Sequence, residues 1–380
     1  MNIVVLRETQ KGESRVALMP ESVKKLVGLK AAVLVESGAG LAAARTDAEF
    51  QEAGAEISTN KAQLLSQADV LAVVNRPATE DLQQLRNGSI MIGFLRPLDE
   101  PSALQPAVSG GLTTFAVELI PRITRAQAMD ALSSMATVAG YKAVLIGASY
   151  IPRMFPLLMT AAGTVPPARV LVLGAGVAGL QAIATARRLG AVVEGYDVRA
   201  AAGEQVKSLG ATFLEVDLGG IKTEDAGGYA VELSDEAMSR GRALIAEHAK
   251  TTDVLITTAQ VPGRRAPLLI TEEAVNGMKR GSVIIDLAGS TGGNCALSKA
   301  DEVVERDGVT ILAPTNLAAT VPVHASQLYS RNITSFLSLL IKDGQLLVDM
   351  NDDVVGPSCV THQGKVVNQR VAASMGSSAA

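Results

Sequence analysis

Aromatic residues are scarce in this chain. They make up 3% of its 380 residues, and there is no tryptophan. Stacked aromatic side chains are the usual platform for single-stranded nucleic acids and sugars, so their scarcity argues against such ligands. Neither sign of charge dominates, since 34 lysines and arginines face 38 aspartates and glutamates, and no basic tail for nucleic acid is expected. A small molecule or another protein is the favoured partner.

Cysteine and histidine are also rare. The two cysteines, Cys295 and Cys359, cannot build a disulfide framework and lie at no spacing typical of a metal site or redox pair. The three histidines, His248, His324 and His362, lie outside every motif, and no metal-ligand cluster or Ser-His-Asp arrangement is apparent. A dehydrogenase that reduces a carbonyl or imine must move a proton as well as a hydride. This shortage of acid and base groups, with no metal predicted, argues against a reaction that needs a positioned proton donor.

Long uninterrupted apolar segments are missing. The N-terminal apolar run covers only Ile3–Leu6, which is too short for the core of an export signal. The segment Val170–Ala186 is more apolar, but it is short for a bilayer and contains three glycines. We therefore expect neither an export signal nor a membrane span, and the two cysteines without a disulfide framework favour a reducing setting.

The chain is long and apolar enough for two cores, because single cores usually stop growing at roughly 250 to 300 residues. Short β-branched runs alternate with amphipathic stretches in two successive blocks. The expected strands are Ile3–Leu6, Ala32–Val35, Val70–Val74, Ile90–Phe94 and Thr113–Val117, then Val170–Leu173, Val192–Tyr196, Thr212–Leu214, Val254–Thr257, Val283–Asp286 and Thr310–Leu312. This alternation predicts an α/β fold with two Rossmann-like domains, whose mostly parallel sheets flank a cleft.

The domain boundaries follow from where each alternation ends. We expect an N-terminal α/β domain at residues 1–132 and a second, nucleotide-binding α/β domain at 133–315. A last helix, about Ser326–Ile341, comes after the second alternation is complete, so residues 316–380 are expected to return to the first domain. The end rich in serine, alanine and glycine, from Ala372 on, is expected to be disordered.

The strongest local motif is ARVLVLGAGVAGLQAIATARRLGAVVEGYDVR. A strand leads into Gly174-x-Gly176-x-x-Gly179, a helix follows, and a second strand ends at Asp197. Such glycines permit a tight turn, close approach of a pyrophosphate and close packing of helix on strand. Glycines used only for packing are the alternative.

Asp197 bears on which nucleotide is preferred. It lies 18 residues after Gly179, where a carboxylate accepts hydrogen bonds from an adenosine ribose and repels a 2′-phosphate. This favours NAD over NADP. Arg199 is close enough to weaken that exclusion, or it is an ion-pair partner of Asp197.

A second polar segment, PRITRAQAMDALSS, lies at the expected exit from the first domain. The polar side chains gathered there are Arg122, Arg125, Gln127, Asp130 and Ser133. Together they are able to hydrogen-bond a carboxamide and a pyrophosphate. An ordinary solvated loop with Asp130 as a helix cap is the alternative, and spacing alone does not decide.

These motifs resemble the alanine dehydrogenase and proton-translocating transhydrogenase family over almost the whole chain. The resemblance includes ESRVALMP around Arg15, the glycine motif, and the later segments TTAQVPGRRAP and VIIDLAGSTGGNC. Within the family, PRITRAQAMDALSS is most similar to the loop of the transhydrogenase NAD(H)-binding component, often called domain I or the α subunit. Gly227-Gly228-Tyr229 matches a mobile loop of the family, and Gln260 matches a residue of its nucleotide pocket.

The resemblance implies roles for these residues. Arg122, Asp130 and Ser133 would orient the nicotinamide end, and Gln127 would reach toward the NADP(H) of a partner; these four form the expected catalytic set. The expected cofactor-binding set comprises Arg122, Arg125, Gln127, Asp130, Ser133, Gly174, Gly176, Val177, Gly179, Asp197, Val198, Arg199, Gly228, Tyr229 and Gln260.

Departures from the family pattern separate its two branches. Alanine dehydrogenases carry a lysine, a histidine and an aspartate where this chain has Asn75, Arg96 and, within one residue, Ser290. Only Arg15 of the substrate set remains. Amino-acid oxidation is therefore disfavoured, in agreement with the shortage of acid and base groups.

The resemblance thus implies a proton-translocating NAD(P)+ transhydrogenase component that binds NAD(H). Hydride would pass directly from NADH to NADP+ on an NADP(H)-binding component, coupled to proton movement through a membrane-spanning component. The chain would be a homodimer, cytoplasmic and peripheral on the inner face of the membrane through these partners. The alternatives are an alanine dehydrogenase-like oxidoreductase and a non-catalytic NAD(H)-sensing module.

Overall fold

The chain forms two compact units. A computed structural model describes residues 1–216, 234–261 and 263–377. The first unit comprises Met1–Met135 and Ala318–Ala380, and the second comprises Ala136–Leu317. The chain therefore leaves the first unit once and returns to it once.

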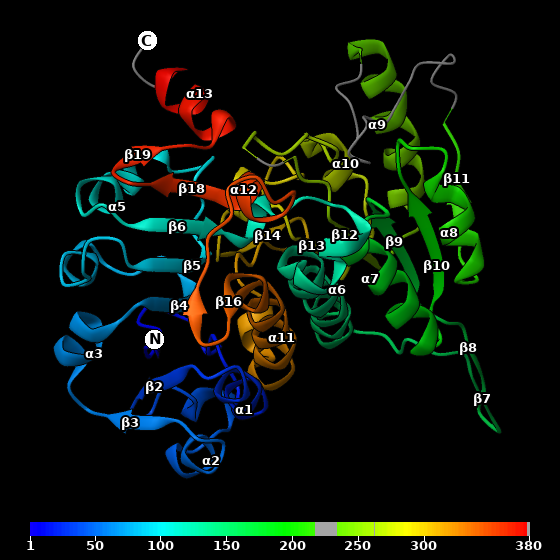
Figure 1. Ribbon diagram of the computed structural model, residues 1–380. Helices are drawn as coiled ribbons and strands as arrows, with labels where there is room; N and C mark the ends of the chain where they lie inside the picture. Colours follow the sequence, from blue (N-terminus) through cyan, green and yellow to red (C-terminus); the bar gives the residue numbers. More distant parts are fainter. Residues whose placement is uncertain (217–233, 262, 378–380) are drawn as a thin grey trace. The chain divides into compact units, whose positions relative to one another are not determined.

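An eight-stranded sheet forms the centre of the first unit (Figure 1). Its order is β19-β18-β6-β5-β4-β1-β2-β3, and neighbours run parallel except where β18 pairs with β6 and β19. The strands are β1 (Asn2–Val5), β2 (Ala32–Glu36), β3 (Glu56–Ser58), β4 (Val70–Asn75), β5 (Ile90–Phe94), β6 (Thr113–Ala116), β18 (Cys359–His362) and β19 (Lys365–Val366). Ile3, Val4 and Val5 are all fully buried, as expected of a central strand covered on both faces.

Helices pack around this sheet. They are α1 (Pro20–Gly28), α2 (Asp47–Glu52), α3 (Lys61–Gln67), α4 (Thr79–Leu82), α5 (Gln105–Ser109), α11 (Pro322–Leu340), α12 (Val355–Ser358) and α13 (Gln369–Ser377). Short 3-10 helices are η1 (Leu41–Ala43), η2 (Pro101–Leu104), η3 (Val117–Leu119), η4 (Thr124–Met129) and η6 (Ala318–Thr320), and β16 (Ile341–Lys342) pairs with β17 (Gln345–Leu346). Thr46 and Glu49 form a capping box that begins α2.

The C-terminal segment is part of the first unit's core. Helix α11 buries ten residues, and its Tyr329 ring stacks on Phe94 with centroids 5.4 Å apart. Strand β18 pairs with β6, where the Thr361 and Thr114 hydroxyls are 2.9 Å apart. Helix α13 corrects the expected disorder from Ala372: the helix runs to Ser377 because fully buried Val371 anchors it.

A seven-stranded sheet forms the centre of the second unit. Its order is β11-β10-β9-β12-β13-β15-β14, parallel except for β14 against β15. The strands are β9 (Arg169–Leu173), β10 (Val192–Tyr196), β11 (Thr212–Leu214), β12 (Val254–Thr257), β13 (Val283–Asp286), β14 (Val303–Arg306) and β15 (Val309–Leu312). The chain runs from β9 outward to β10 and β11, then returns to β12 on the other side of β9. The end of β9 is thus a topological switch point, where ligands bind in open α/β sheets.

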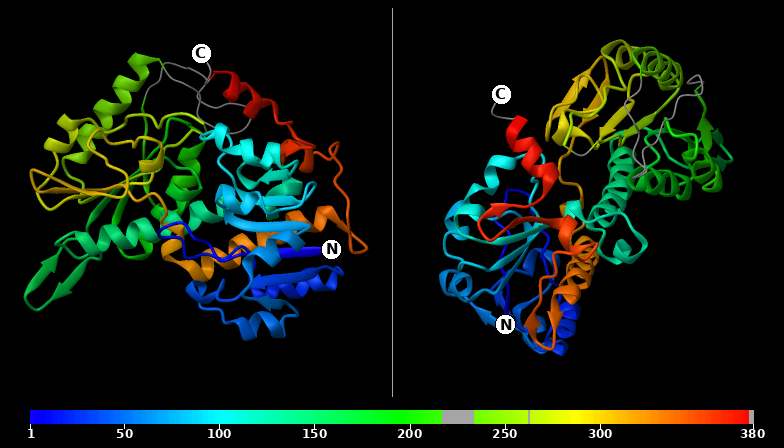
Figure 2. Two further views of the ribbon diagram at one scale, coloured as in Figure 1. Left: turned by 90° about the vertical axis from the view of Figure 1, so that its left-hand side faces the viewer. Right: turned by 45° about the horizontal axis from the view of Figure 1, so that its top comes forward.

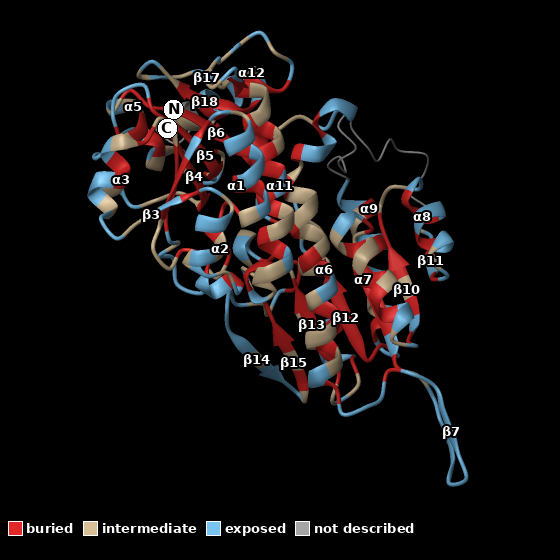
Figure 3. Ribbon diagram, turned by 60° about the horizontal axis from the view of Figure 1, so that its bottom comes forward, coloured by how far each residue is buried: buried red, intermediate tan, exposed pale blue. Residues whose placement is uncertain are grey.

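The helices of the second unit flank this sheet, whose strands are largely buried (Figure 3). They are α6 (Ala131–Tyr150), α7 (Val177–Arg188), α8 (Ala202–Ser208), α9 (Asp235–Ala249), α10 (Glu272–Asn276) and the 3-10 helix η5 (Gly289–Thr291), α6 beginning within the first unit. These two units confirm the expected α/β class with mostly parallel sheets. The expected cleft between them stays a prediction.

Among the described residues, α6 is the helix that is long and apolar enough, by length and composition alone, to cross a membrane. Ala143 and Val144 are nevertheless fully buried in the core of the second unit, and a Cβ on Gly140 would lie 2.1 Å from the Ala178 carbonyl oxygen. These are the contacts of a core helix packed closely on α7.

An exposed hairpin projects from the second unit, as Figures 1 and 2 show. It consists of β7 (Leu158–Thr160) and β8 (Gly163–Val165), and all six strand residues are exposed. The sequence alone did not predict this hairpin. It carries apolar side chains into solvent, Met159 at 75% exposure among them.

Candidate functional site

The glycine motif forms a tight turn between β9 and α7. Gly174 has φ of +97°, and a Cβ there would lie 2.5 Å from the Thr258 Oγ1. A Cβ on Gly179 would lie 1.7 Å from the Gly174 carbonyl oxygen, so only glycine allows this close packing. Around Gly176, in contrast, a Cβ would meet no described atom within 4 Å outside the neighbouring residues and the adjoining helix backbone. The first and third glycines therefore serve geometry, and the second leaves open space in front of the helix.

The N-terminus of α7 faces that space without a side-chain cap. Gly176 is the N-cap residue, no side-chain cap hydrogen bond is present, and no acidic residue occupies the first turn. Val177, the first helical residue, is 41% exposed. Uncapped N–H groups and the positive end of the helix dipole favour an anion. This end of α7 fits a dinucleotide pyrophosphate.

Asp197 follows β10 and connects it to the glycine turn. Its Oδ2 accepts the Ala175 N–H at 2.7 Å, and its Oδ1 accepts the Arg199 N–H at 2.9 Å. The Arg199 guanidinium donates to both oxygens, each at 2.9 Å, in a bidentate ion pair. The sequence left two roles open for Arg199, and the structure shows one of them, that of an ion-pair partner of Asp197. Val198, between them, is half-buried.

A buried polar network, which sequence reasoning missed, fixes the segments after β12 and β13. The Asp286 carboxylate is fully buried and accepts hydrogen bonds from the Thr257 and Ser298 hydroxyls and from the N–H groups of Ala288, Asn294 and Cys295. The Asn294 amide in turn bonds both the N–H and the carbonyl of Ala259. The one signal in the sequence was the aspartate that ends the buried strand VIID. The network was not predicted from it because the partners of Asp286 lie up to 29 residues away.

This network holds the Thr258–Gln260 segment beside the glycine turn. The Thr258 hydroxyl donates to the Gly174 carbonyl at 3.0 Å. Gln260 is exposed, and its Nε2 donates to the Leu287 carbonyl at 2.6 Å. The second unit therefore brings Gly174, Gly176, Gly179, Asp197, Arg199 and Gln260 to one end of its sheet.

The segment with Gln127 lies in the first unit as the 3-10 helix η4. Ala126 and Met129 are buried beneath it, and Arg122 and Gln127 are exposed. Asp130 accepts the Ser133 N–H at 2.8 Å and the Ser133 hydroxyl at 2.5 Å. The structure thus shows Asp130 as the cap of α6, and a cofactor role for it stays a prediction.

Other expected site residues fall elsewhere. The Arg125 guanidinium is paired with the carboxylates of Asp352 and Asp353. Gly228 and Tyr229 lie outside the described residues.

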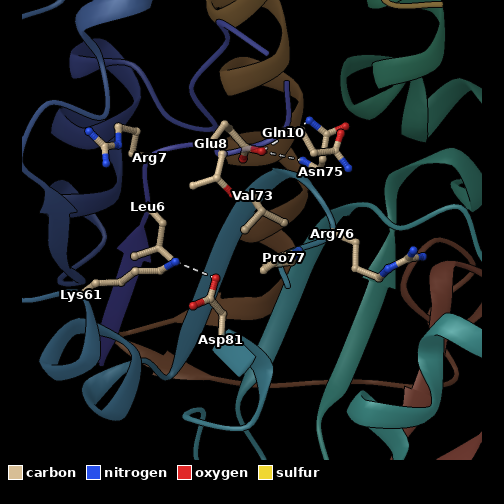
Figure 4. A pocket seen from close by; sticks show the side chains of 11 residues that line it. Leu6, Arg7, Glu8, Gln10, Lys61, Val73, Asn75, Arg76, Pro77 and Asp81 are labelled. Carbon is tan, nitrogen blue, oxygen red and sulfur yellow. Dashed lines mark hydrogen bonds and ion pairs between the residues drawn. The ribbon is translucent and has the colours of Figure 1, made fainter. Parts of the chain in front are cut away.

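A small pocket in the first unit contains paired polar residues (Figure 4). Glu8 accepts the Val74 N–H at 2.6 Å, and burial raises the pKa of Glu8 to about 7. Elsewhere in the first unit, Arg15 donates to Glu13 in a bidentate pair of 2.7 and 2.6 Å. Burial opposes ionisation of Glu13, but the hydrogen bonds and charge of Arg15 hold the pKa of that carboxyl at about 2. Asn75 donates to the Glu13 Oε2 at 2.8 Å.

Two of the three positions that distinguish alanine dehydrogenases, Asn75 and Arg96, have partners within this chain. The Arg96 guanidinium pairs with Glu100 at 3.1 Å, and Ser290 lies exposed in η5 of the other unit. Arg15 already has a carboxylate of this chain as partner. The described residues do not offer a lysine, histidine and aspartate set for a small amino acid.

Comparison with known proteins gives matches over nearly the whole chain. The model for the alanine dehydrogenase/PNT N-terminal domain matches residues 4–139, and that for the C-terminal domain matches residues 143–369. The chain is 48% identical to an NAD(P) transhydrogenase subunit alpha chain of Rhodospirillum rubrum over 376 residues, covering 97% of this chain and 98% of the relative. It is 28% identical over 384 residues to alanine dehydrogenase of Mycobacterium tuberculosis, covering 99% and 97% of the two chains.

A solved structure is similar as well. The crystal structure of transhydrogenase from Sinorhizobium meliloti superposes with a TM-score of 0.88 at 45% identity, covering 97% of this chain and 100% of that one.

Proposed function

Because this chain belongs to the alanine dehydrogenase/PNT family, we propose that it is the NAD(H)-binding component of a proton-translocating NAD(P) transhydrogenase. Family membership makes it an NAD-binding, oxidoreductase-type chain with a Rossmann-like fold. The observation that carries the proposal is the open, uncapped N-terminus of α7, with Asp197 one strand away.

The residues of the second unit bind the nucleotide in this proposal. The N–H groups at the start of α7 hold the pyrophosphate, and the Asp197 carboxylate accepts a hydrogen bond from the adenosine ribose. The bidentate pair with Arg199 holds the Asp197 carboxylate in a fixed orientation. Gly228, Tyr229 and Gln260 complete the pocket by family resemblance.

The residues of η4 act at the reacting end. When bound, NADH would supply the hydride and NADP+ on the partner component would accept it, so that no proton need be exchanged with a side chain. Arg122, Asp130 and Ser133 orient the nicotinamide, and Gln127 reaches toward the NADP(H). Correct placement of two rings at roughly 3 to 3.5 Å is a proximity effect.

Two observations favour this branch of the family over amino-acid oxidation. Arg15 already donates to Glu13 in a bidentate pair, so a substrate carboxylate would have to compete with Glu13 for the guanidinium. Asn75 and Arg96 replace the proton donor and substrate contact of the other branch. The identity of 48% to a transhydrogenase subunit, against 28% to an alanine dehydrogenase, agrees with this choice.

The partners are part of the proposal. They are an NADP(H)-binding component, a membrane-spanning proton-channel component and a second copy of this chain; nucleic acid is not among them. The relatives named as subunits support an assembly, and the exposed apolar side chains of Met154, Leu157 and Met159 at the hairpin offer a surface for the second copy. The chain would then lie at the cytoplasmic, inner face of the membrane, held there by its partners.

The experiment that tests the proposal measures NADH oxidation by the purified chain in two mixtures. One contains pyruvate and ammonium, and the other contains an NADP+-loaded transhydrogenase NADP(H)-binding component. We expect turnover only with the second. Turnover with pyruvate and ammonium would contradict the proposal, and nucleotide-dependent partner binding without any hydride transfer would favour a sensing module.

The Gln127→Asn variant tests the role of η4 in transfer. Shortening an exposed side chain by one methylene displaces its amide without disturbing the buried Ala126 and Met129, so we expect the transfer rate to fall by about 10²-fold. NADH affinity, measured by fluorescence titration, should stay within about twofold. Gln51→Asn, at an exposed glutamine of α2, is the control. If affinity falls as much as rate, Gln127 is a binding residue instead.

A further inference from the structure

The segment that carries Gln127 is tied to the C-terminal part of the first unit by a charged contact. The Arg125 Nη2 donates to the Asp352 Oδ2 at 2.6 Å, and its Nη1 donates to Asp353. Arg125 and Asp352 are 227 residues apart in sequence. The contact joins two distant parts of the chain two residues before Gln127.

Asp352 is a firmly placed partner. Its other oxygen, Oδ1, accepts the N–H groups of Val354 at 2.8 Å and Val355 at 3.1 Å. Both valines are buried, with 0% and 2% exposure, so the turn is anchored in the core. Hydrogen bonding from Arg125 lowers the pKa of Asp352 to about 2, and the carboxylate is charged at neutral pH.

A second tie holds the other side of η4. The Asn332 Nδ2, on α11, donates to the Ala128 carbonyl at 2.9 Å. Ala126 and Met129 point into the unit, at 1% and 6% exposure. Gln127 therefore lies between two anchored neighbours, with its own side chain exposed.

We propose that Asp352 is a positioning residue for hydride transfer, which acts through Arg125 to hold η4 and with it Gln127 in the geometry that the reaction needs. This inference rests on the proposed function. It assigns Arg125 to positioning in place of the cofactor contact expected from the sequence.

The ion pair between Arg125 and Asp352 is expected to matter for the placement of Gln127 and to contribute little to the free energy of unfolding. Arg125 is 46% exposed in its side chain, and ion pairs so exposed contribute little to folding, so the fold should survive loss of the pair. A displacement of about 1 Å at a reacting group, in contrast, can cost up to 10²-fold in rate. Loss of the pair should therefore be seen in the rate of hydride transfer rather than in the free energy of unfolding.

The test is a double-mutant cycle with Arg125→Gln, Asp352→Asn and the double variant. Asparagine keeps an oxygen for the Val354 and Val355 N–H groups and removes the charge. We expect each single variant to lower kcat of transfer roughly tenfold, with KM for NADH within about twofold. The double variant should be no slower than Arg125→Gln alone, because loss of the guanidinium already removes the contact that Asp352→Asn disrupts, together with the pair to Asp353. Arg125→Lys should recover part of the rate.

The control is Arg86→Gln, which breaks an exposed ion pair with Asp69 elsewhere in the first unit and should leave kcat unchanged. Additive effects, or single variants within twofold of the wild-type kcat, would overturn the proposal.

Hydrogen exchange of the amides at residues 124–129 reports on the tie without any partner protein. Exchange should accelerate in Arg125→Gln and Asp352→Asn and not in Arg86→Gln; unchanged exchange would also overturn the proposal. If the wild-type chain transfers no hydride, the proposed function fails first, while exchange still decides whether the pair orders η4.

Discussion

At the carboxyl end of the first sheet, glutamate side chains accept the backbone N–H groups that end neighbouring strands. Glu118, after β6, accepts the N–H groups of Leu95 at 2.9 Å and Arg96 at 2.5 Å. Its Oε2 is buried and has no hydrogen-bond partner among the described residues. Burial raises the pKa of Glu118 to about 7, against an ordinary value of 4.5.

This raised pKa makes stability depend on pH. Between about pH 4.5 and 7 the folded chain binds a proton that the unfolded chain has lost, so the free energy of unfolding falls as pH rises and levels off above 7. A shift of this size corresponds to about 3 kcal/mol, at about 1.4 kcal/mol per pKa unit. Glu118→Gln should remove that part of the slope and be the more stable protein at pH 8.

Urea denaturation at pH 5 and pH 8 measures the effect. Glu8 keeps its own raised pKa, so some slope remains in the variant. Glu52→Gln, at an exposed position of α2, is the control and should follow the wild type. A variant of Glu118 with the wild-type slope would show that this carboxyl is ionised throughout.

Asp197 and Arg199 set the second residue-scale prediction. Asp197→Asn keeps an oxygen for the Ala175 N–H but removes the charge, and it leaves the Arg199 guanidinium without a carboxylate. A 2′-phosphate would no longer be repelled, so we expect the preference for NADH over NADPH, as a ratio of Kd values, to fall by about tenfold or more. Fluorescence titration with both nucleotides measures it. Arg199→Gln is the matched control, and an unchanged ratio in Asp197→Asn would move the discrimination elsewhere.

Sequence spacing predicted on which elements these residues lie, but it could not predict the directions of their side chains. It put Asp197 after the second strand, yet it left Arg199 with two roles, because the direction of a guanidinium depends on local geometry. Asp286 was missed because its five hydrogen-bond donors come from three separate stretches of chain. The ion pairs of Arg125 were missed because its partners, Asp352 and Asp353, lie far along the sequence.

At the scale of elements, buried strands were predictable and exposed ones were not. Every expected strand of the two alternations is present within one or two residues, because continuous β-branched runs mark strands covered on both faces. Those missed, such as β3, β14 and the hairpin of β7 and β8, lie at edges or in solvent, where no apolar run is required. Helix α11 begins at Pro322, before the expected start, because proline is well tolerated at the first helical position.

The turn between β9 and α7 gives a prediction in which two glycines behave differently. In Gly176→Ala the new methyl enters open space, so we expect the free energy of unfolding to change by less than about 1 kcal/mol and NADH affinity to fall tenfold or more. In Gly179→Ala the methyl collides with the Gly174 carbonyl, and about 2 to 3 kcal/mol of stability should be lost. Denaturation and nucleotide titration of both variants check this. Normal NADH binding by Gly176→Ala would place the pyrophosphate elsewhere.

At the scale of the whole molecule, the chain crosses between its two units twice. Residues 318–380 supply α11, β18, β19 and α13 to the first unit, and residues 136–317 make up the second. The return of the C-terminal segment could be expected from the sequence, since a further helix follows a completed alternation. The position of its strand β18 beside β6 could not be predicted from the sequence. Cys359–His362 is only a four-residue strand, and no sequence pattern indicates which strand it pairs with.

This arrangement predicts that removal of the C-terminal segment affects the two units unequally. A chain that ends at Leu317 loses Tyr329 and Phe336, which are fully buried against Phe94 and Phe115, and it exposes the edge of β6. Each buried aromatic ring alone contributes roughly 2 to 3 kcal/mol, so the first unit should not remain folded. The second unit keeps all seven strands of its sheet.

Hydrogen exchange of the truncated chain distinguishes the units. We expect amides of β1, β4 and β5 to exchange at unfolded rates, while those of β9, β12 and β13 stay protected. A fragment of residues 131–317, which retains all of α6, is the control and should show the same protection in its sheet. Protection retained in β4 and β5 would mean that the first sheet forms on residues 1–135 alone, with the C-terminal segment docked on a finished core. Loss of protection in both units would mean that the second depends on the first, and that the two are a single folding unit.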